Sequence, residues 1–130
     1  MKSSYVYIGL VVVIIVGLVL IRNGSNASRE NLSITQYDSF AQCIADAGAK
    51  FYGAYWCPHC QEQEELFDNS KYLPYIECST PNGQNQTKTC VDAGITGYPT
   101  WIFADGSIAN GLQSFEELAG KTNCELPVAQ

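Results

Sequence analysis

The chain has 130 residues, a formal net charge of −6 at pH 7 and 46% hydrophobic residues, which are concentrated near its amino end. From Glu30 onward it carries 13 acidic side chains against four lysines. So acidic a segment, with no basic stripe, argues against nucleic acid as a partner. Its aromatic and β-branched content excludes a disordered chain, and the lack of an internal repeat excludes solenoid and collagen-like architectures. The composition indicates one small acidic domain behind an apolar leader.

Residues 1–22 predict a transmembrane anchor. The 17 positions from Tyr5 to Ile21 hold no charged side chain. As a helix they would be about 26 Å long at roughly 1.5 Å per residue, which with two preceding serines just crosses a bilayer core of about 30 Å. Tyr7 would lie at one interface and Arg22 at the other. The protein is therefore expected to reach the membrane through a single amino-terminal helix.

Two alternatives to an anchor stay open. A cleaved signal peptide would use Lys2 as its positive region and Ser25-Asn26-Ala27 as a cleavage site before Ser28. The other alternative is a core helix of the globular domain. We favour the uncleaved anchor, because the apolar stretch is longer than the usual core of a signal peptide. Residues 23–31 after it are small and polar, as in a flexible linker.

Six cysteines follow the linker, and their number and density indicate a compartment. A dense, even cysteine count behind a translocation signal is typical of an oxidising environment. We therefore expect the domain to lie outside the cytoplasm, in a periplasm or at the cell surface. The six are Cys43, Cys57, Cys60, Cys78, Cys90 and Cys124.

The pattern after the linker predicts α/β layers around a mixed sheet. Helices are expected near 36–47, 58–67, 87–93 and 115–119, and strands near 51–55, 73–78, 100–104 and 107–110. Thr35 is a suitable N-cap for the first helix, and Gly48 would end it. Ser114 with Glu117 forms a capping box for the last helix. The dipeptide 105–106, Asp-Gly, indicates a hairpin between the last two strands.

The segment Cys57-Pro58-His59-Cys60 stands where the first predicted strand meets a helix. Two intervening residues on a first helical turn bring the sulfurs within disulfide reach. Cys57 would face the positive end of the helix dipole, which stabilises a thiolate, and a protonated His59 would favour the same thiolate. A lowered pKa would make Cys57 a good leaving group, so that a disulfide there is easily passed on. Cys60, deeper in the helix, would be the shielded resolving thiol.

Two other interpretations of the motif are weaker. Half of a zinc site would need scattered partners such as Cys78 and Cys90, because His59 is the chain's one histidine and no second pair has this spacing. An inert structural disulfide would close too short a loop to constrain the chain much. The sequence therefore predicts a redox-active pair that uses no metal and no other cofactor.

Three ordered motifs resemble the thioredoxin-fold family: FYGAYWCPHC at 51–60, YIEC at 75–78 and DAGITGYPTW at 92–101. They are similar in particular to the thioredoxin-like domain that is fused to bacterial and plant vitamin K epoxide reductase homologues. The tetrapeptide Cys-Pro-His-Cys is also that of the oxidant DsbA. The resemblance implies a thioredoxin-like domain over 32–130 that exchanges disulfides with protein thiols.

The resemblance also implies a substrate groove. Tyr98-Pro99-Thr100 matches the family's cis-proline segment, which faces the active-site disulfide and pairs with substrate backbone, so a cis bond before Pro99 is expected on this ground. Trp56, just before the first cysteine, matches as well. One position departs: many thioredoxins keep a buried carboxylate six residues before the first cysteine, where this chain has Phe51. That departure weakens the case for efficient reductase chemistry, because the carboxylate relays the proton of the resolving thiol.

The other four cysteines allow three pairings. We favour Cys78–Cys90, which would pin the polar loop 79–86, and Cys43–Cys124, which would staple the two terminal elements. Each disulfide contributes about 3 to 4 kcal/mol in the chain-entropy model. The alternative for Cys78–Cys90 is a second redox pair that relays electrons.

Together these features predict a membrane-anchored thiol–disulfide oxidoreductase that forms or isomerises disulfides in exported proteins. The Pro58-His59 dipeptide and the helix start would both stabilise the reduced form, which favours this direction. A separate quinone-linked membrane oxidase, resembling vitamin K epoxide reductase or DsbB, would reoxidise the site. The alternatives are a dedicated thiol reductant, for example in cytochrome maturation, and a non-catalytic binding module held by disulfides.

Overall fold

The structure is a computed structural model that describes residues 9, 11–15 and 35–128. The chain divides into two units, Met1–Ser33 and Ile34–Gln130. Most of the predicted anchor 1–22 and all of the linker 23–31 lie outside the described residues. Within the described ranges, no helix combines the length and the apolar character that crossing a membrane requires.

Four strands of the second unit form one mixed sheet in the order β2-β1-β3-β4. Their bounds are β1 Lys50–Gly53, β2 Tyr75–Glu77, β3 Thr100–Ile102 and β4 Ile108–Asn110. β1 is parallel to β2, whereas β3 is antiparallel to both of its neighbours, β1 and β4. The hairpin between β3 and β4 turns at Gly106, whose φ of +80° suits a residue without a side chain. The mixed sheet predicted from the sequence is confirmed.

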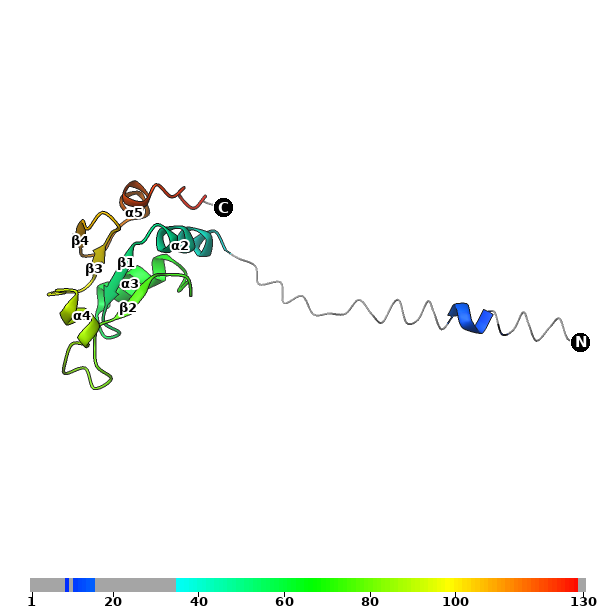
Figure 1. The fold of residues 1–130 in the computed structure, drawn as a ribbon, viewed down its shortest axis with the longest axis horizontal. Helices are drawn as coiled ribbons and strands as arrows, with labels where there is room; N and C mark the ends of the chain where they lie inside the picture. Colours follow the sequence, from blue (N-terminus) through cyan, green and yellow to red (C-terminus); the bar gives the residue numbers. More distant parts are fainter. Residues whose placement is uncertain (1–8, 10, 16–34, 129–130) are drawn as a thin grey trace, which may run out of the picture. The chain divides into compact units, whose positions relative to one another are not determined.

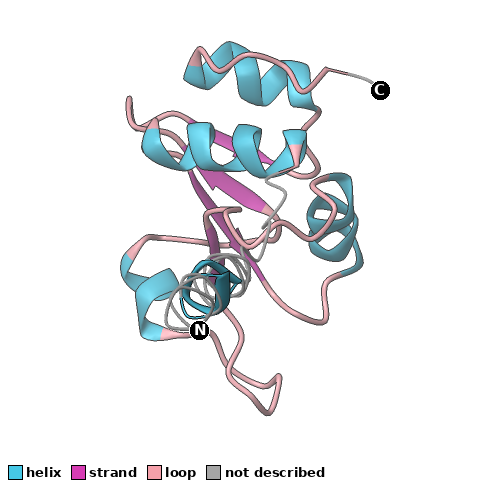
Figure 2. Ribbon diagram, turned by 90° about the vertical axis from the view of Figure 1, so that its right-hand side faces the viewer, coloured by secondary structure: helices cyan, strands magenta, loops and turns pink. Residues whose placement is uncertain are grey.

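Helices flank the sheet on both sides (Figures 1 and 2). Their bounds are α2 Gln36–Asp46, α3 Pro58–Leu66, α4 Lys88–Asp92 and α5 Phe115–Thr122. Successive side chains of a strand point to opposite faces, and the neighbours Phe51 and Tyr52 of β1 accordingly belong to two different core clusters. The cluster of Phe51 includes residues of α2, α3 and α5, and the cluster of Tyr52 includes Cys90 of α4.

Stacked aromatic rings build the larger cluster. Phe51 lies against Trp101 with 4.8 Å between ring centroids, and both side chains are fully buried. Phe40, Phe67 and Phe115 make three mutual contacts at 5.0 to 5.8 Å. Phe51, which replaces the carboxylate of many thioredoxins, is thus a packing residue at the centre of this core.

Capping explains the helix ends, including one that the sequence analysis placed wrongly. Capping boxes start α2 at Thr35 and α5 at Ser114, and the second was predicted. The last helix was expected to end at Ala119, before Gly120, but it continues to Thr122. Asn123 is the residue that takes the left-handed conformation, with φ of 57°, and it ends the helix instead of the glycine.

Two disulfides close the domain. Cys43 of α2 is bonded to Cys124, and Cys78 to Cys90, with Cα–Cα distances of 6.0 and 5.5 Å. Of the three possible pairings, this is the one that the sequence favours. Cys43–Cys124 joins residues 81 positions apart, whereas Cys78–Cys90 spans 12 positions. The first therefore constrains the unfolded chain more than the second.

We expect replacement of both Cys43 and Cys124 by alanine to lower the free energy of unfolding by about 4.5 kcal/mol in the chain-entropy model. The matched control, with Cys78 and Cys90 both replaced by alanine, should lose only about 3 kcal/mol because its loop is shorter. Urea unfolding under non-reducing conditions measures both. A larger loss in the control would contradict the entropic account.

Candidate active site

The segment 57–60 forms the beginning of α3. Cys57 is the N-cap, with an extended backbone and a side chain that makes no capping hydrogen bond. Pro58 takes the first turn, where its missing N–H costs nothing. Both cysteines are free thiols, but Cys57 keeps 6% of its surface exposed while Cys60 has none. A reagent in solution therefore meets Cys57 before Cys60.

The environment of Cys60 holds its proton. Burial, and secondly a hydrogen bond with the Cys57 thiol, raises the pKa of Cys60 to about 12. The nearby Glu64 carboxylate acts in the same direction. Cys60 is therefore a neutral thiol at physiological pH, and its proton must be removed before it attacks a mixed disulfide.

Gly53, at the end of β1, makes room for the Cys60 sulfur. A Cβ at this position would lie 3.1 Å from Cys60 Sγ and 2.6 Å from Cε2 of the Tyr75 ring. The second distance is too short for any side chain, so the close approach requires glycine. The Tyr75 ring and the Cys60 sulfur both crowd the space that a side chain at position 53 would occupy.

A carboxylate lies beside this contact, on β2. Glu77 Oε2 accepts hydrogen bonds from the Tyr75 hydroxyl (2.7 Å) and from the Tyr55 N–H (3.1 Å), and Oε1 accepts one from the Ser79 N–H (2.7 Å). Burial and then Glu77 raise the pKa of Tyr75 and the pKa of Glu64. The sequence analysis missed Glu77, although it lies in the quoted YIEC motif.

Trp56 and Tyr98 bring the predicted groove segments together. Their rings meet edge to face with 5.9 Å between centroids, and Trp56 is half exposed. The Tyr98–Pro99 bond is cis, and Pro99 is buried. Thr100 is also buried, and its hydroxyl donates to the Gly97 carbonyl at 2.8 Å. The Thr100 side chain is thus engaged within the fold, whereas Trp56 offers a free surface.

His59 occupies the solvent side of the motif. Its side chain is 71% exposed, and Nδ1 lies 3.4 Å from a carboxylate oxygen of Glu62. A charge so exposed is screened by salt. The difference in burial between the two cysteines therefore distinguishes their thiols more strongly than the charge of His59 does.

Cys78 and Cys90 do not extend the site. They are bonded to each other, so they are not available to complete a zinc site with Cys57 and Cys60. Both are fully buried, which shields their disulfide from thiolates in solution.

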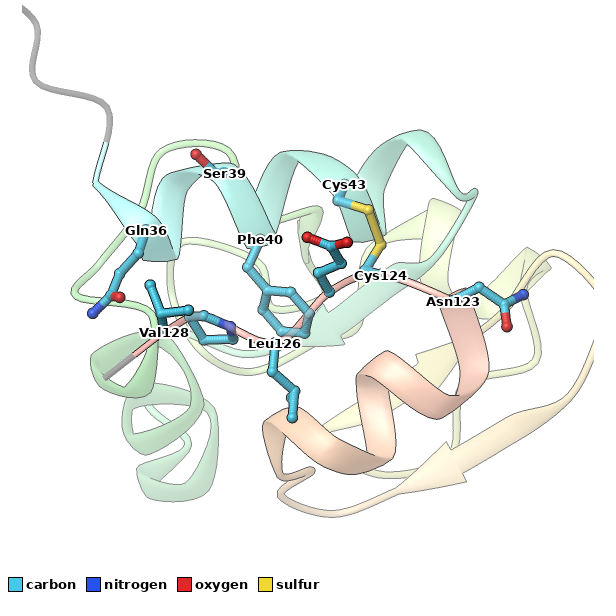
Figure 3. A pocket seen from close by; sticks show the side chains of 10 residues that line it. Gln36, Ser39, Phe40, Cys43, Asn123, Cys124, Leu126 and Val128 are labelled. Atoms are coloured by element: carbon cyan, nitrogen blue, oxygen red, sulfur yellow. A yellow bond between two sulfur atoms is a disulfide. The ribbon is translucent and has the colours of Figure 1, made fainter. Parts of the chain in front are cut away.

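A pocket of about 560 Å³ lies elsewhere, between α2 and the segment after α5 (Figure 3). Phe40, Leu126 and the Cys43–Cys124 disulfide contribute to its lining, and no residue of the Cys-Pro-His-Cys motif does. The pocket is therefore separate from the exchange site.

A mixed four-stranded sheet flanked by helices, with a Cys-x-x-Cys motif at a helix start and a cis-proline segment, fits the thioredoxin-like class. No protein-family model matches the chain. It is similar to the thiol-disulfide oxidoreductase LTO1 of Arabidopsis thaliana, with 41% identity over 97 residues, which cover 70% of this chain and 25% of that protein. The chain thus spans about a quarter of the length of this curated relative. The likeness is thus to one part of a thiol-disulfide oxidoreductase.

In a Cys57→Ser variant, we expect Cys60 to stay protonated well above the ordinary cysteine pKa of about 8.5, because burial, the main cause of its raised pKa, remains. Ultraviolet thiolate absorbance measures this titration, and the same variant in denaturant is the control. Because the raised pKa belongs to the folded state, the stability from this thiol is present below about pH 8.5 and is lost as the pH rises toward 12. Equal midpoints in the folded and denatured protein would refute the assignment.

Proposed function

We propose that this chain is a protein thiol–disulfide oxidoreductase that acts through Cys57 and Cys60, and that it oxidises or isomerises disulfides in exported proteins. One observation carries the proposal: a helix start presents Cys57 and buries its partner Cys60 completely. The similarity to a thiol-disulfide oxidoreductase supports the same chemistry.

Oxidation of a substrate dithiol takes two successive thiolate attacks. A substrate thiolate attacks Cys57 Sγ of the oxidised pair, the Cys57–Cys60 bond breaks, and Cys60 leaves with the electron pair and takes up a proton. A second substrate thiolate then attacks the substrate sulfur of the mixed disulfide and releases Cys57 as a thiolate. The substrate dithiol is oxidised by two electrons, and Cys57 and Cys60 are reduced.

The direction rests on Cys57. Cys60 leaves as a thiolate in the oxidising step and must become one in the reductive step, so its raised pKa slows both and selects neither. The N-cap position of Cys57 supports release of its thiolate, since the helix dipole favours negative charge there.

The proposal includes a location and a partner. We place the domain outside the cytoplasm, anchored by residues 1–22 and reoxidised by a quinone-linked membrane thiol oxidase of the vitamin K epoxide reductase or DsbB type. Two disulfides within so small a domain support an oxidising compartment.

The reduction potential of the Cys57–Cys60 pair tests the direction. We expect a value nearer to the −120 mV of strong oxidants than to the −270 mV of thioredoxin. Equilibration against glutathione buffers, followed through tryptophan fluorescence beside the site (Trp56), gives the value. A Cys57→Ser variant is the control and should show no couple. A potential near −270 mV would identify a reductant instead, and no couple in the unsubstituted protein would remove the catalytic proposal.

Replacing Cys60 by alanine should trap the reaction halfway. When the reduced variant is mixed with a substrate protein that holds a disulfide, the Cys57 thiolate attacks that disulfide, and the mixed disulfide should accumulate because the Cys60 thiol that would release it is missing. Non-reducing electrophoresis and mass spectrometry detect the adduct. The matched Cys57→Ala variant should form none, since Cys60 has no exposed surface. Adducts on Cys60 in that variant would contradict the assigned roles.

A further inference from the structure

The loop between β2 and α4 is folded as an arm, residues 79–87, which projects from the end of the sheet in Figure 1. A β-bridge pairs Ser79 with Gln86 near its two ends. Closer to the tip, the Thr80 N–H donates to the Asn85 carbonyl (2.9 Å), and Thr80 Oγ1 accepts from the Asn85 N–H (3.1 Å). The arm is therefore ordered by its own hydrogen bonds although most of it is exposed.

One side of the arm holds the two exposed aromatic residues that precede Cys57. Trp56 Nε1 donates to Ser79 Oγ at 2.8 Å, and the Tyr55 hydroxyl donates to the Pro81 carbonyl at 3.3 Å. The arm's Gly83 packs so near that a Cβ there would lie 3.2 Å from the Tyr55 hydroxyl. Each ring is thus fixed at one edge, while Tyr55 remains 47% and Trp56 50% exposed.

The other end of the arm holds the cis-proline segment. Gln86 Nε2 donates to the Tyr98 hydroxyl and to the Ile95 carbonyl, both at 2.9 Å. The Tyr98 ring in turn meets Trp56. One arm therefore braces aromatic side chains from both segments of the predicted groove.

This surface differs in charge from the rest of the domain. The arm carries no charged side chain, and neither do the three aromatic residues that it braces, in a chain whose formal net charge is −6. Rigid aromatic faces bind apolar side chains, and the amides and hydroxyls beside them can hydrogen-bond to the backbone of a bound polypeptide. The occupant that fits is an unfolded polypeptide segment with aliphatic or aromatic side chains next to its cysteine.

We propose that the arm, with Tyr55 and Trp56, selects polypeptide substrates by binding the apolar residues that flank a substrate cysteine. The inference rests on the proposed function. Ser79 and Gln86 are positioning residues, because they act by fixing Trp56 and Tyr98. The arm's hydrogen bonds to the groove are with Tyr55, Trp56 and Tyr98 rather than with the thiols, so a small disulfide without a polypeptide chain reaches Cys57 without the arm.

The test compares two substrates in Ser79→Ala and Gln86→Ala variants. One substrate is a two-cysteine peptide with leucine and phenylalanine beside its cysteines, and the other is the small disulfide 2-hydroxyethyl disulfide. Each lost neutral hydrogen bond should raise KM for the peptide about fivefold and change kcat less than twofold. The rate with the small disulfide and the reduction potential should not change.

A Gln42→Ala variant is the matched control, because that exposed side chain donates its hydrogen bond to Asp46 within α2 and lies outside the arm. A control peptide with serine in place of the apolar residues should show the same KM in all variants. Circular dichroism verifies that the variants fold. Because Ser79→Ala and Gln86→Ala each remove a different contact, either variant tests the inference if the other does not fold.

Two results would overturn the inference alone: an unchanged peptide KM in folded, active variants, or an equal loss with both substrates. The second would mean that the arm acts on the exchange site itself. No exchange with either substrate in the unsubstituted protein would refute the proposed function together with the inference.

Discussion

The burial of the Cys60 sulfur against the end of β1 is the constraint on which the site depends. It requires Gly53, because a Cβ there would collide with the Tyr75 ring and press on the sulfur. It also makes the two thiols unequal, since burial raises the pKa of Cys60 to about 12 while Cys57 stays at the rim. Position in the fold thus leaves Cys57 accessible and Cys60 covered, while His59 lies on the exposed side of the motif.

Phe51 occupies the position at which many thioredoxins keep a carboxylate. Its ring stacks on Trp101 in the centre of the core, where an ionised group would cost far more than it could contribute. A carboxylate stands instead on β2, where Glu77 accepts three hydrogen bonds, one of them from the Tyr75 hydroxyl. After burial and the Cys57 thiol, the carboxylate that raises the pKa of Cys60 is Glu64 of α3.

Local signals were sufficient for much of the fold and the motif. Helix caps, the Asp-Gly hairpin and the Cys-x-x-Cys spacing are short-range features, and they predicted the mixed sheet and the start of α3. Glu77 was missed because its role depends on the parallel register that sets it beside Gly53. The arm was predicted as a loop, but its contacts with Tyr55, Trp56 and Tyr98 join residues 12 to 26 positions apart. The end of α5 was misjudged because glycine is tolerated within a helix and asparagine can end one.

The two core clusters hold the two cysteine pairs apart. Cys57 and Cys60 belong to the larger cluster, and Cys78 and Cys90, which tie the arm to the sheet, belong to the smaller one. Tyr98 packs against both. A change within the arm therefore reaches Trp56 and Tyr98 directly, and through Tyr98 it also bears on the cluster that buries Cys60. Tyr98 is thus the residue that links the arm to the packing around the thiols.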